Sequence, residues 1–406
     1  MTSRAKKRLF NVFRITLCVA ALAIVIQGVT IHDHITPADR SANLVGIVVD
    51  DDPGAESIVL ELSEGQREVV KRSDIATDES GAPEITYGLI STWRKAGKWY
   101  LLLAVVIHFF VVFPQALRFQ WMLRVQGIMV GYWESLKLAF AGNFLNFATP
   151  LGSNAGDVFK AYFVSLHTDR KTEAVTTVVL DRIVGLVSLL IVVAAITTFS
   201  PSDSRLAAFK FYFLAMLGIG LVAAVLYLAP PVRRRLVPWS WLSRLPMFEQ
   251  LQRIDRTARV LAGSPLTLVN VFLLTVFLQA MAIGAYFTVA VALGLTANRG
   301  NVLEYYTYFY TGVLIQALPG PPQGLGTVEL AYRYFLAPFG SPSQIICVAF
   351  AIRLVVLTVA LPGLLVTLTG SYKPRMATAG DEAAPDTGDA SAEAPPAAEK
   401  HELVTS

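Results

Sequence analysis

The 406-residue sequence has little charge and almost no cysteine. Asp, Glu, Lys and Arg make up 16% of its residues, whereas a soluble domain carries about a quarter. Cys18 and Cys347 are its two cysteines and both lie in apolar runs, which excludes a disulfide framework and a cysteine-based metal site. No P-loop is present, so nothing indicates nucleotide hydrolysis. We expect neither a cofactor nor a bound metal.

Apolar residues are abundant instead. They make up 54% of the chain, and the mean hydropathy is +0.52, which is typical of an integral membrane protein. The net charge is +4. Because Lys and Arg cluster beside apolar runs rather than on one amphipathic face, the charge indicates membrane topology and not nucleic-acid binding.

The first apolar run, Leu9–Ile31, follows four basic residues. It is long enough to span and lacks a convincing signal-peptide cleavage site, so we expect an uncleaved anchor (residues 1–31) with a cytoplasmic N-terminus. A polar segment, residues 32–98, would then lie outside. The next span runs from Trp99 to Arg118, where Arg118 and Arg124 return the chain to the inside.

Within the outer segment, alternating apolar residues predict a small β-meander over Leu44–Val49, Ile58–Leu62 and Glu68–Val70. The acidic triplet Asp50–Asp52 stands just before Pro53. We interpret the triplet as an acidic hairpin turn, although a divalent cation site is the alternative reading.

The membrane domain, residues 99–370, contains two interrupted apolar stretches among its spans. Trp133–Phe147 enters from the cytoplasm, and Val158–Leu166 returns there after a Pro-Gly break. Tyr305–Leu318 enters from outside, and Val328–Phe339 returns there after a second break. Because none of these arms has the roughly twenty residues needed to span, both are predicted to be re-entrant hairpins.

Four further spans complete the predicted topology. They are Ala174–Phe199, Phe211–Leu228, Leu266–Leu295 and Ile345–Leu368. Trp239–Gly263 should lie on the inner surface as an amphipathic helix. Residues 371–406 are rich in Ala, Pro, Asp and Glu, which predicts a disordered cytoplasmic tail. The expected fold is therefore an all-α polytopic membrane protein of the plasma (inner) membrane, with about six full spans, two oppositely oriented hairpins and a small extracytoplasmic β module.

The two breaks look like copies of one pattern. Residues 148–163 read ATPLGSNAGDVFKAYF and residues 317–334 read ALPGPPQGLGTVELAYRY. From Pro150 to Ala161 is 11 residues and from Pro319 to Ala331 is 12, and an arginine follows 21 and 22 residues later. Entry from opposite faces makes this an inverted repeat, as in many secondary transporters. The helix-break residues are Pro150, Gly152, Gly156, Pro319, Gly320, Gly324 and Gly326.

Charges inside the spans indicate a site. Arg182 and Arg353 each lie eight residues into a span, where a charge costs at least about 2.5 kcal/mol. An anion must meet them, either an internal acid (Asp157, Asp181 or Glu329) or a lipid phosphate. Asp157 and Thr327 stand where the helices restart, as plain N-caps or facing a substrate.

Other polar residues near the breaks complete the candidate set. Lys160 and Arg333 could bind substrate or extend toward an interface. The tyrosines at 305, 306, 308 and 310 are read as an interfacial aromatic belt, and His108 as a packed residue. The candidate substrate-binding residues are Asn146, Asn154, Asp157, Lys160, Asp181, Arg182, Gln316, Glu329, Arg333 and Arg353.

Four segments resemble the lysylphosphatidylglycerol synthase transmembrane-region family, also called the flippase-like domain family. They read ALRFQWMLRVQGI, NFATPLGSNAGDVFKAYFV, VVLDRIVGL and LPGPPQGLGTVELAYRYFLAPFG, and the resemblance covers roughly Lys98–Thr369. It implies re-entrant helices and a flippase that moves an aminoacylated phospholipid between leaflets. On this chain it implies a lipid site at Asp157, Lys160, Asp181, Arg182, Glu329 and Arg353.

The chain departs from that family in three ways. A disordered tail stands where lipid-synthesising relatives have an acyltransferase domain, so we expect no enzyme activity. Extra prolines stiffen the second break, and the β module is an addition.

We expect transport of a membrane lipid with an anionic or zwitterionic headgroup, either downhill or coupled to an ion gradient, with acids as possible proton carriers. Two alternatives stay open: a polyprenyl-phosphate-dependent glycosyltransferase using Asp50–Asp52, or a non-catalytic membrane partner protein. A homo-oligomer or a lipid-modifying enzyme partner is possible.

Overall fold

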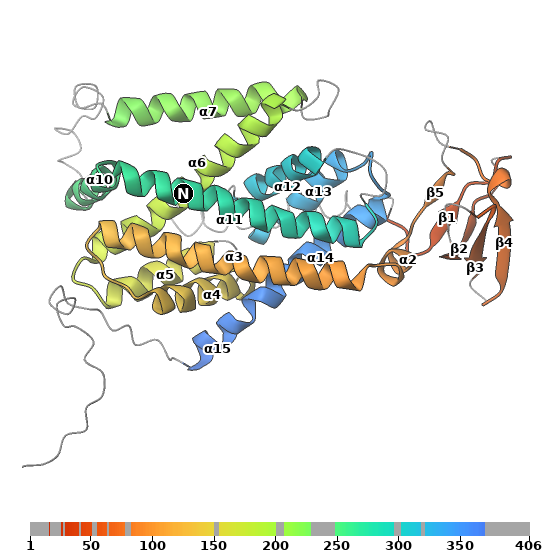
Figure 1. The fold of residues 1–406 in the computed structure, drawn as a ribbon, viewed down its shortest axis with the longest axis horizontal. Coiled ribbons are helices and arrows are strands. Elements are labelled where there is room, and N and C mark those ends of the chain that lie inside the picture. The colour runs from red at the N-terminus through yellow and green to blue at the C-terminus, as the bar shows by residue number, and fades with distance from the viewer. Residues whose placement is uncertain are drawn as a thin grey trace, which may run out of the picture.

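The computed structural model describes residues 29–39, 42–50, 55–62, 65–77, 83–149, 154–199, 207–228, 248–295, 302–317 and 321–369, together with positions 16 and 26. Most of these residues form a long helical bundle with a small β-sheet at one end (Figure 1). The expected N-terminal anchor, apart from its last residues, the expected C-terminal tail, and the break residues Pro150, Gly152, Pro319 and Gly320 lie outside the described residues.

The sheet is antiparallel and contains five strands in the order β4-β3-β2-β1-β5. The strands are β1 (Asp33–Ile35), β2 (Leu44–Asp50), β3 (Ser57–Glu61), β4 (Arg67–Lys71) and β5 (Ile85–Thr86). The meander expected from the sequence corresponds to β2, β3 and β4. The short strands β1 and β5 extend it because they pair with each other beside β2.

A buried aspartate joins the sheet to the helices. The carboxylate of Asp33 accepts hydrogen bonds from the backbone N–H groups of Val48 and Gly88, each at 2.6 Å, and from the Ser91 hydroxyl. Ser91 lies in the short helix α2 (Leu89–Arg94). Since a buried carboxylate needs such donors, Asp33 ties β2 to the segment that leads into the bundle.

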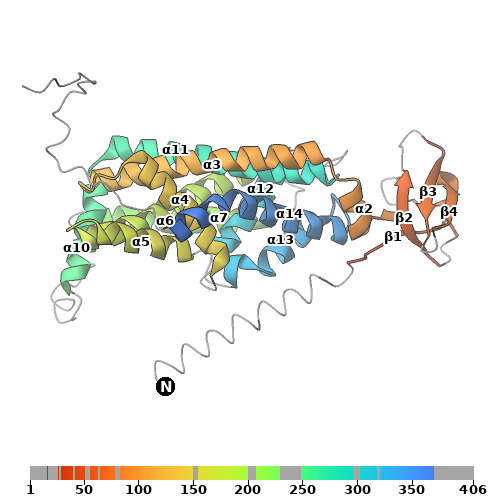
Figure 2. The same ribbon diagram turned by 90° about the horizontal axis from the view of Figure 1, so that it is seen from below.

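Within the described ranges, four helices are long and apolar enough to cross a membrane: α3 (Lys98–Val125), α6 (Lys171–Phe199), α11 (Pro265–Ala292) and α14 (Pro342–Ala360). Helices α3 and α11 lie side by side along the length of the bundle in both views (Figure 2). Helix α7 (Ala207–Leu228) is also apolar, and its apolar stretch over Phe209–Val222 is shorter than those of the four long helices.

Helix α10 (Phe248–Ala262) forms within the segment predicted to be amphipathic. It lies at the end of the bundle away from the sheet (Figure 1). Its Thr257 carbonyl accepts a 3.0 Å hydrogen bond from the side chain of Gln126, just past the end of α3. Helix α10 is therefore attached to the bundle as well as amphipathic.

Shorter helices fill the space between the long ones. Helices α4 (Tyr132–Ala148) and α5 (Ala155–Leu166) lie in the half of the bundle away from the sheet. Helices α12 (Val302–Ala317) and α13 (Thr327–Phe335), joined through a 3-10 turn η3 (Pro322–Gly324), lie in the half nearer the sheet (Figure 1). The two interrupted stretches thus occupy opposite halves.

Two helix ends differ from those expected. The span expected to end at Arg118 continues to Val125, because Arg118 is buried against an acid and does not mark a membrane surface. The span expected over Ile345–Leu368 is two helices, α14 and α15 (Pro362–Thr369). Proline has no N–H to continue the helix.

The tyrosines predicted to form an interfacial belt are instead largely in the core. Tyr305, Tyr308 and Tyr310 are each no more than 2% exposed. They pack on α12 against α11, α13 and α14, and the Tyr305 hydroxyl donates to the Leu295 carbonyl at 2.8 Å. The belt interpretation was wrong because a tyrosine buries its ring readily once its hydroxyl has an acceptor.

Candidate functional site

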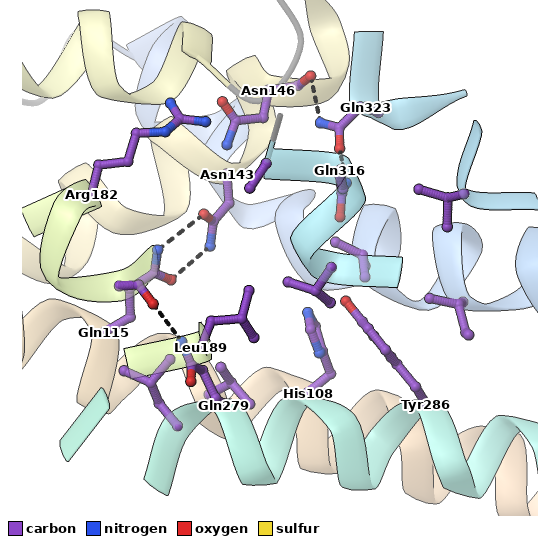
Figure 3. A pocket seen from close by; sticks show the side chains of 18 of the residues that line it. His108, Gln115, Asn143, Asn146, Arg182, Leu189, Gln279, Tyr286, Gln316 and Gln323 are labelled. Carbon is purple, nitrogen blue, oxygen red and sulfur yellow. Dashed lines mark hydrogen bonds between the residues drawn. The ribbon is translucent and has the colours of Figure 1, made fainter. Parts of the chain in front are cut away.

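A cavity of about 390 Å³ lies inside the bundle, between the two interrupted stretches. That volume falls within the range of about 300–1,000 Å³ for small-molecule sites. Helices α3, α4, α5, α6, α11, α12, α13 and α14 contribute to its wall. Amide side chains face it from both halves: Gln115, Asn143, Asn146, Gln279, Gln316 and Gln323 (Figure 3). A polar cavity in an apolar bundle is a candidate site for a polar ligand.

The first ion pair of the cavity joins α6 to α5. Arg182 donates from Nη1 to Asp157 Oδ2 at 2.6 Å, and both side chains are about 30% exposed. Asp157 lies in the first turn of α5, which begins at Ala155, so it is not the N-cap. The dipole of α5 favours a carboxylate in its first turn. The Asp157 carboxylate also neutralises Arg182, which lies within the apolar helix α6.

The second ion pair joins α14 to α13. Glu329 Oε1 accepts from Arg353 Nε at 2.7 Å and from Arg353 Nη2 at 2.6 Å. Its other oxygen accepts from the Gly326 N–H at 2.7 Å, closing the helix start. Gly326 has φ = 84°, a conformation that glycine adopts without strain. Glu329 is 1% exposed and does not line the cavity, so it supports Arg353 from behind.

A third pair, between α3 and α6, was missed by the sequence analysis. Arg118 Nη2 lies 2.9 Å from Asp181 Oδ2, and both side chains are at most 10% exposed. Arg118 Nη1 also donates to the Thr275 hydroxyl at 3.3 Å. From the sequence, Asp181 was named only as a possible ion-pair partner of Arg182 or Arg353. The apolar residues that continue past Arg118 to Val125 were the signal in the sequence that Arg118 lies within a span.

Lys160 on α5 also lines the cavity. It is 6% exposed, and its ammonium lies 5.6 Å from the centre of the Phe119 ring. Asp157, which could have paired with it three residues away, binds Arg182 instead. Within the described ranges, Lys160 has no ion pair and no hydrogen-bond acceptor.

The two interrupted stretches touch through amide groups. Gln323 donates from Nε2 to the Asn146 carbonyl at 2.7 Å and accepts from Gln316 Nε2 at 2.6 Å (Figure 3). The Asn146 side chain in turn accepts from the Gly156 N–H at 2.7 Å. Arg353 also donates to the Gln323 carbonyl at 3.2 Å. The end of α4 and the turn before α13 therefore meet at one place.

A second amide pair closes the wall between α3 and α4. Gln115 and Asn143 exchange hydrogen bonds at 3.4 and 3.2 Å (Figure 3). Gln279 donates to the Gly185 carbonyl at 3.0 Å, which links α11 to α6. Buried amides that bond one another hold helices together where the surroundings are apolar.

Besides Glu329, two predicted substrate-binding residues do not line the cavity. Asn154 is exposed at the N-cap of α5, and Arg333 on α13 does not line the cavity. Gly324 has φ = 63° in the turn beside Gln316.

Among the described residues, no group of three or more His, Cys, Asp or Glu side chains could hold a metal. Asp51 and Asp52 of the acidic triplet lie outside those residues.

Comparison with known proteins places the chain in a family. No curated protein matches its sequence. The family model of the lysylphosphatidylglycerol synthase TM region matches residues 87–363, which include the whole cavity. With at least four helices in its described part that are long and apolar enough to cross a membrane, the chain is a multi-pass membrane protein that belongs to the lysylphosphatidylglycerol synthase TM region family.

Proposed function

We propose that this protein moves a lipid with a charged headgroup between the two leaflets of the inner membrane. The observation that carries the proposal is the polar cavity at the meeting point of the two interrupted stretches, with ion pairs on its wall. Backbone freed by a helix break survives in a membrane only where it is buried in protein or lines a cavity. Sites built where interrupted helices meet are typical of transporters.

In this proposal, α4–α5 and α12–α13 are re-entrant hairpins related by inversion. Their places in opposite halves of the bundle support it (Figure 1). The ion pairs support it too: Asp157 precedes Arg182 by 25 residues, and Glu329 precedes Arg353 by 24. The same acid–arginine link thus recurs after each break. The sheet would lie outside, and both termini would be cytoplasmic, around about six full spans.

The ion pairs suggest how a headgroup could be bound without leaving a bare charge. A lipid phosphate that enters the cavity replaces Asp157 as the partner of Arg182, and similarly Glu329 as the partner of Arg353. Each arginine keeps an anionic partner throughout, and the carboxylate that it releases takes up a proton, so that no unpaired charge is left within the membrane. The acyl chains remain in lipid while one repeat rocks against the other. No chemical step is assigned to the chain.

The freed acids fit either mode of energy supply. Asp157 and Glu329 would be proton carriers if transport is coupled to an ion gradient, with Asp181 as a third candidate. If transport is downhill, Asp157 and Glu329 would simply re-form their pairs.

The proposal is tested by lipid exchange in proteoliposomes. The purified full chain is reconstituted with a fluorescent lipid, and a membrane-impermeant quencher measures how fast inner-leaflet lipid becomes accessible. Wild type should exchange lipid faster than protein-free vesicles, and Arg182→Gln and Arg353→Gln should slow exchange by at least about tenfold. Arg259→Gln is the control, because Arg259 is paired on α10 away from the cavity. Equal rates in all four proteins would refute the proposal.

A further inference from the structure

Among the described residues, the cavity wall carries four cations and only three of them have a carboxylate partner. The cations are Arg118, Lys160, Arg182 and Arg353. Three carboxylates neutralise three of them: Asp181 binds Arg118, Asp157 binds Arg182, and Glu329 binds Arg353 from behind. The fourth cation, Lys160, has no carboxylate within ion-pair distance among the described residues.

The surroundings of Lys160 hold its ammonium in the cavity. Its side chain passes Gly142, where a Cβ would lie 3.1 Å from Lys160 Cε. Gly156 packs directly on the Gly142 backbone, so α4 and α5 approach closely beside this stem. The Phe119 ring provides a cation–π contact, worth about 0.5–2 kcal/mol. That is less than the cost of holding a charge inside a membrane, so the site favours an added anion.

The extra cation belongs to one half of the repeat. Aligning Ala161 with Ala331 places Leu330 opposite Lys160. Helix α13, the counterpart of α5, contributes Val328 and Tyr332 to the wall, and no lysine. The acid–arginine pairs are therefore balanced between the halves, whereas the positive charge on α5 is not. This extra charge acts on the net charge of a ligand, because each half already has one acid–arginine pair of its own.

We propose that the cavity selects a headgroup with net negative charge, whose phosphate binds the ammonium of Lys160. This inference rests on the proposed function and narrows its substrate class. A zwitterionic or aminoacylated headgroup brings an ammonium of its own into a cavity that is already positive. A phosphodiester whose remaining groups are uncharged, for example hydroxyls, does not. Lys160 is a headgroup-binding residue in this scheme, while Arg182 and Arg353 exchange partners during transport.

The test measures binding, so that it does not depend on transport. Thermal unfolding of the purified full chain in detergent is followed with increasing dioctanoyl-phosphatidylglycerol, which carries one net negative charge, or dioctanoyl-phosphatidylcholine, which carries none. A ligand that binds the folded state raises the melting temperature according to its affinity. Wild type should bind the anionic lipid at least about tenfold more tightly, because both lipids offer a phosphate to Lys160 but only the zwitterionic lipid adds a positive charge to a cavity that is already positive.

Variants assign that preference to a residue. Lys160→Met should remove it, and Lys160→Arg should retain it. Lys137→Met is the control, because Lys137 pairs with Glu134 on the same hairpin and does not line the cavity. Removing an unpaired buried charge should not unfold the protein. An unchanged preference in Lys160→Met, or no preference in wild type, would overturn the inference.

Two further arms separate this inference from the proposed function. Inorganic phosphate and glycerol phosphate should bind much more weakly than the lipid, and equal binding would overturn assignment of the site to a lipid. Headgroup preference without lipid exchange would refute transport and leave the anion site standing. Exchange that is equally fast for both lipids, with no preference in binding, would support transport and refute the anion site.

Discussion

Gln323 donates a hydrogen bond to the backbone carbonyl of Asn146 at 2.7 Å, although 177 positions separate them in the chain. Gln323 lies in the turn before α13, and Asn146 lies near the end of α4. This bond joins the two interrupted stretches where each helix has stopped. Its donor has φ = 56°, a left-handed conformation that is costly for a residue other than glycine.

Substituting Gln323 should separate the contribution of the bond from that of the backbone strain. Gln323→Ala removes the donor and keeps the strain, so we expect a destabilisation of about 1–3 kcal/mol. Gln323→Gly removes the donor and relieves the left-handed conformation, so it should be less harmful by about 1 kcal/mol. Thermal unfolding in detergent measures both variants. Identical melting temperatures would contradict a strained conformation at this turn.

The pair of Glu329 and Arg353 should behave as a coupled unit. Glu329→Gln leaves Arg353 charged and half-buried without its carboxylate, which should cost up to about 3–5 kcal/mol. Adding Arg353→Gln removes that charge, so the double variant should be more stable than Glu329→Gln alone. A double-mutant cycle on unfolding measures the coupling. Simple additivity of the two substitutions would show that the side chains do not interact as the 2.6 and 2.7 Å contacts indicate.

Arg118 should be a structural residue of the membrane domain. Arg118→Met leaves Asp181 buried without its partner, and we expect a loss of about 3–5 kcal/mol. Arg124→Met, at the exposed end of the same helix, should change stability by no more than about 0.5 kcal/mol. Comparable losses at the two positions would contradict the burial of Arg118.

Close helix packing at Gly156 gives a steric prediction. A Cβ on Gly156 would overlap the Gly142 carbonyl, so Gly156→Ala should force α5 away from α4 and lower the melting temperature. Gly218→Ala is the matched control, because a Cβ there meets no described atom within 4 Å and alanine favours a helix by about 1 kcal/mol. If Gly156→Ala and Gly218→Ala change the melting temperature equally, the backbones of α4 and α5 do not approach closely at Gly142 and Gly156.

The sequence predicted those features that local patterns encode. Both interrupted stretches appear because Pro and Gly stop a helix, and the acids near Arg182 and Arg353 could be anticipated from repeated spacing. Arg118 was misplaced because charge-based topology reads a terminal arginine as a membrane boundary. Its partner Asp181 is 63 residues away, and only tertiary packing brings the two together.

Packing also explains the other differences. Tyr305 and Tyr308 fit the sequence pattern of an interfacial belt and are nevertheless buried, since their neighbours on α13 and α14 cover them. Lys160 could not be distinguished from a lysine that extends to the surface. Its burial depends on the close approach of Gly142 and Gly156, which no single-sequence pattern reveals.

Access to the cavity from both membrane faces is the most direct test of the account. Asn143→Cys on the cavity wall, in a background with Cys18→Ser and Cys347→Ser, is treated with a membrane-impermeant thiol reagent from either side of proteoliposomes. We expect modification from both sides. Leu102→Cys, at an exposed position of α3 that does not line the cavity, should react from neither side. Modification of Asn143→Cys from one side only, or from neither side, would contradict a cavity that alternates between the two faces.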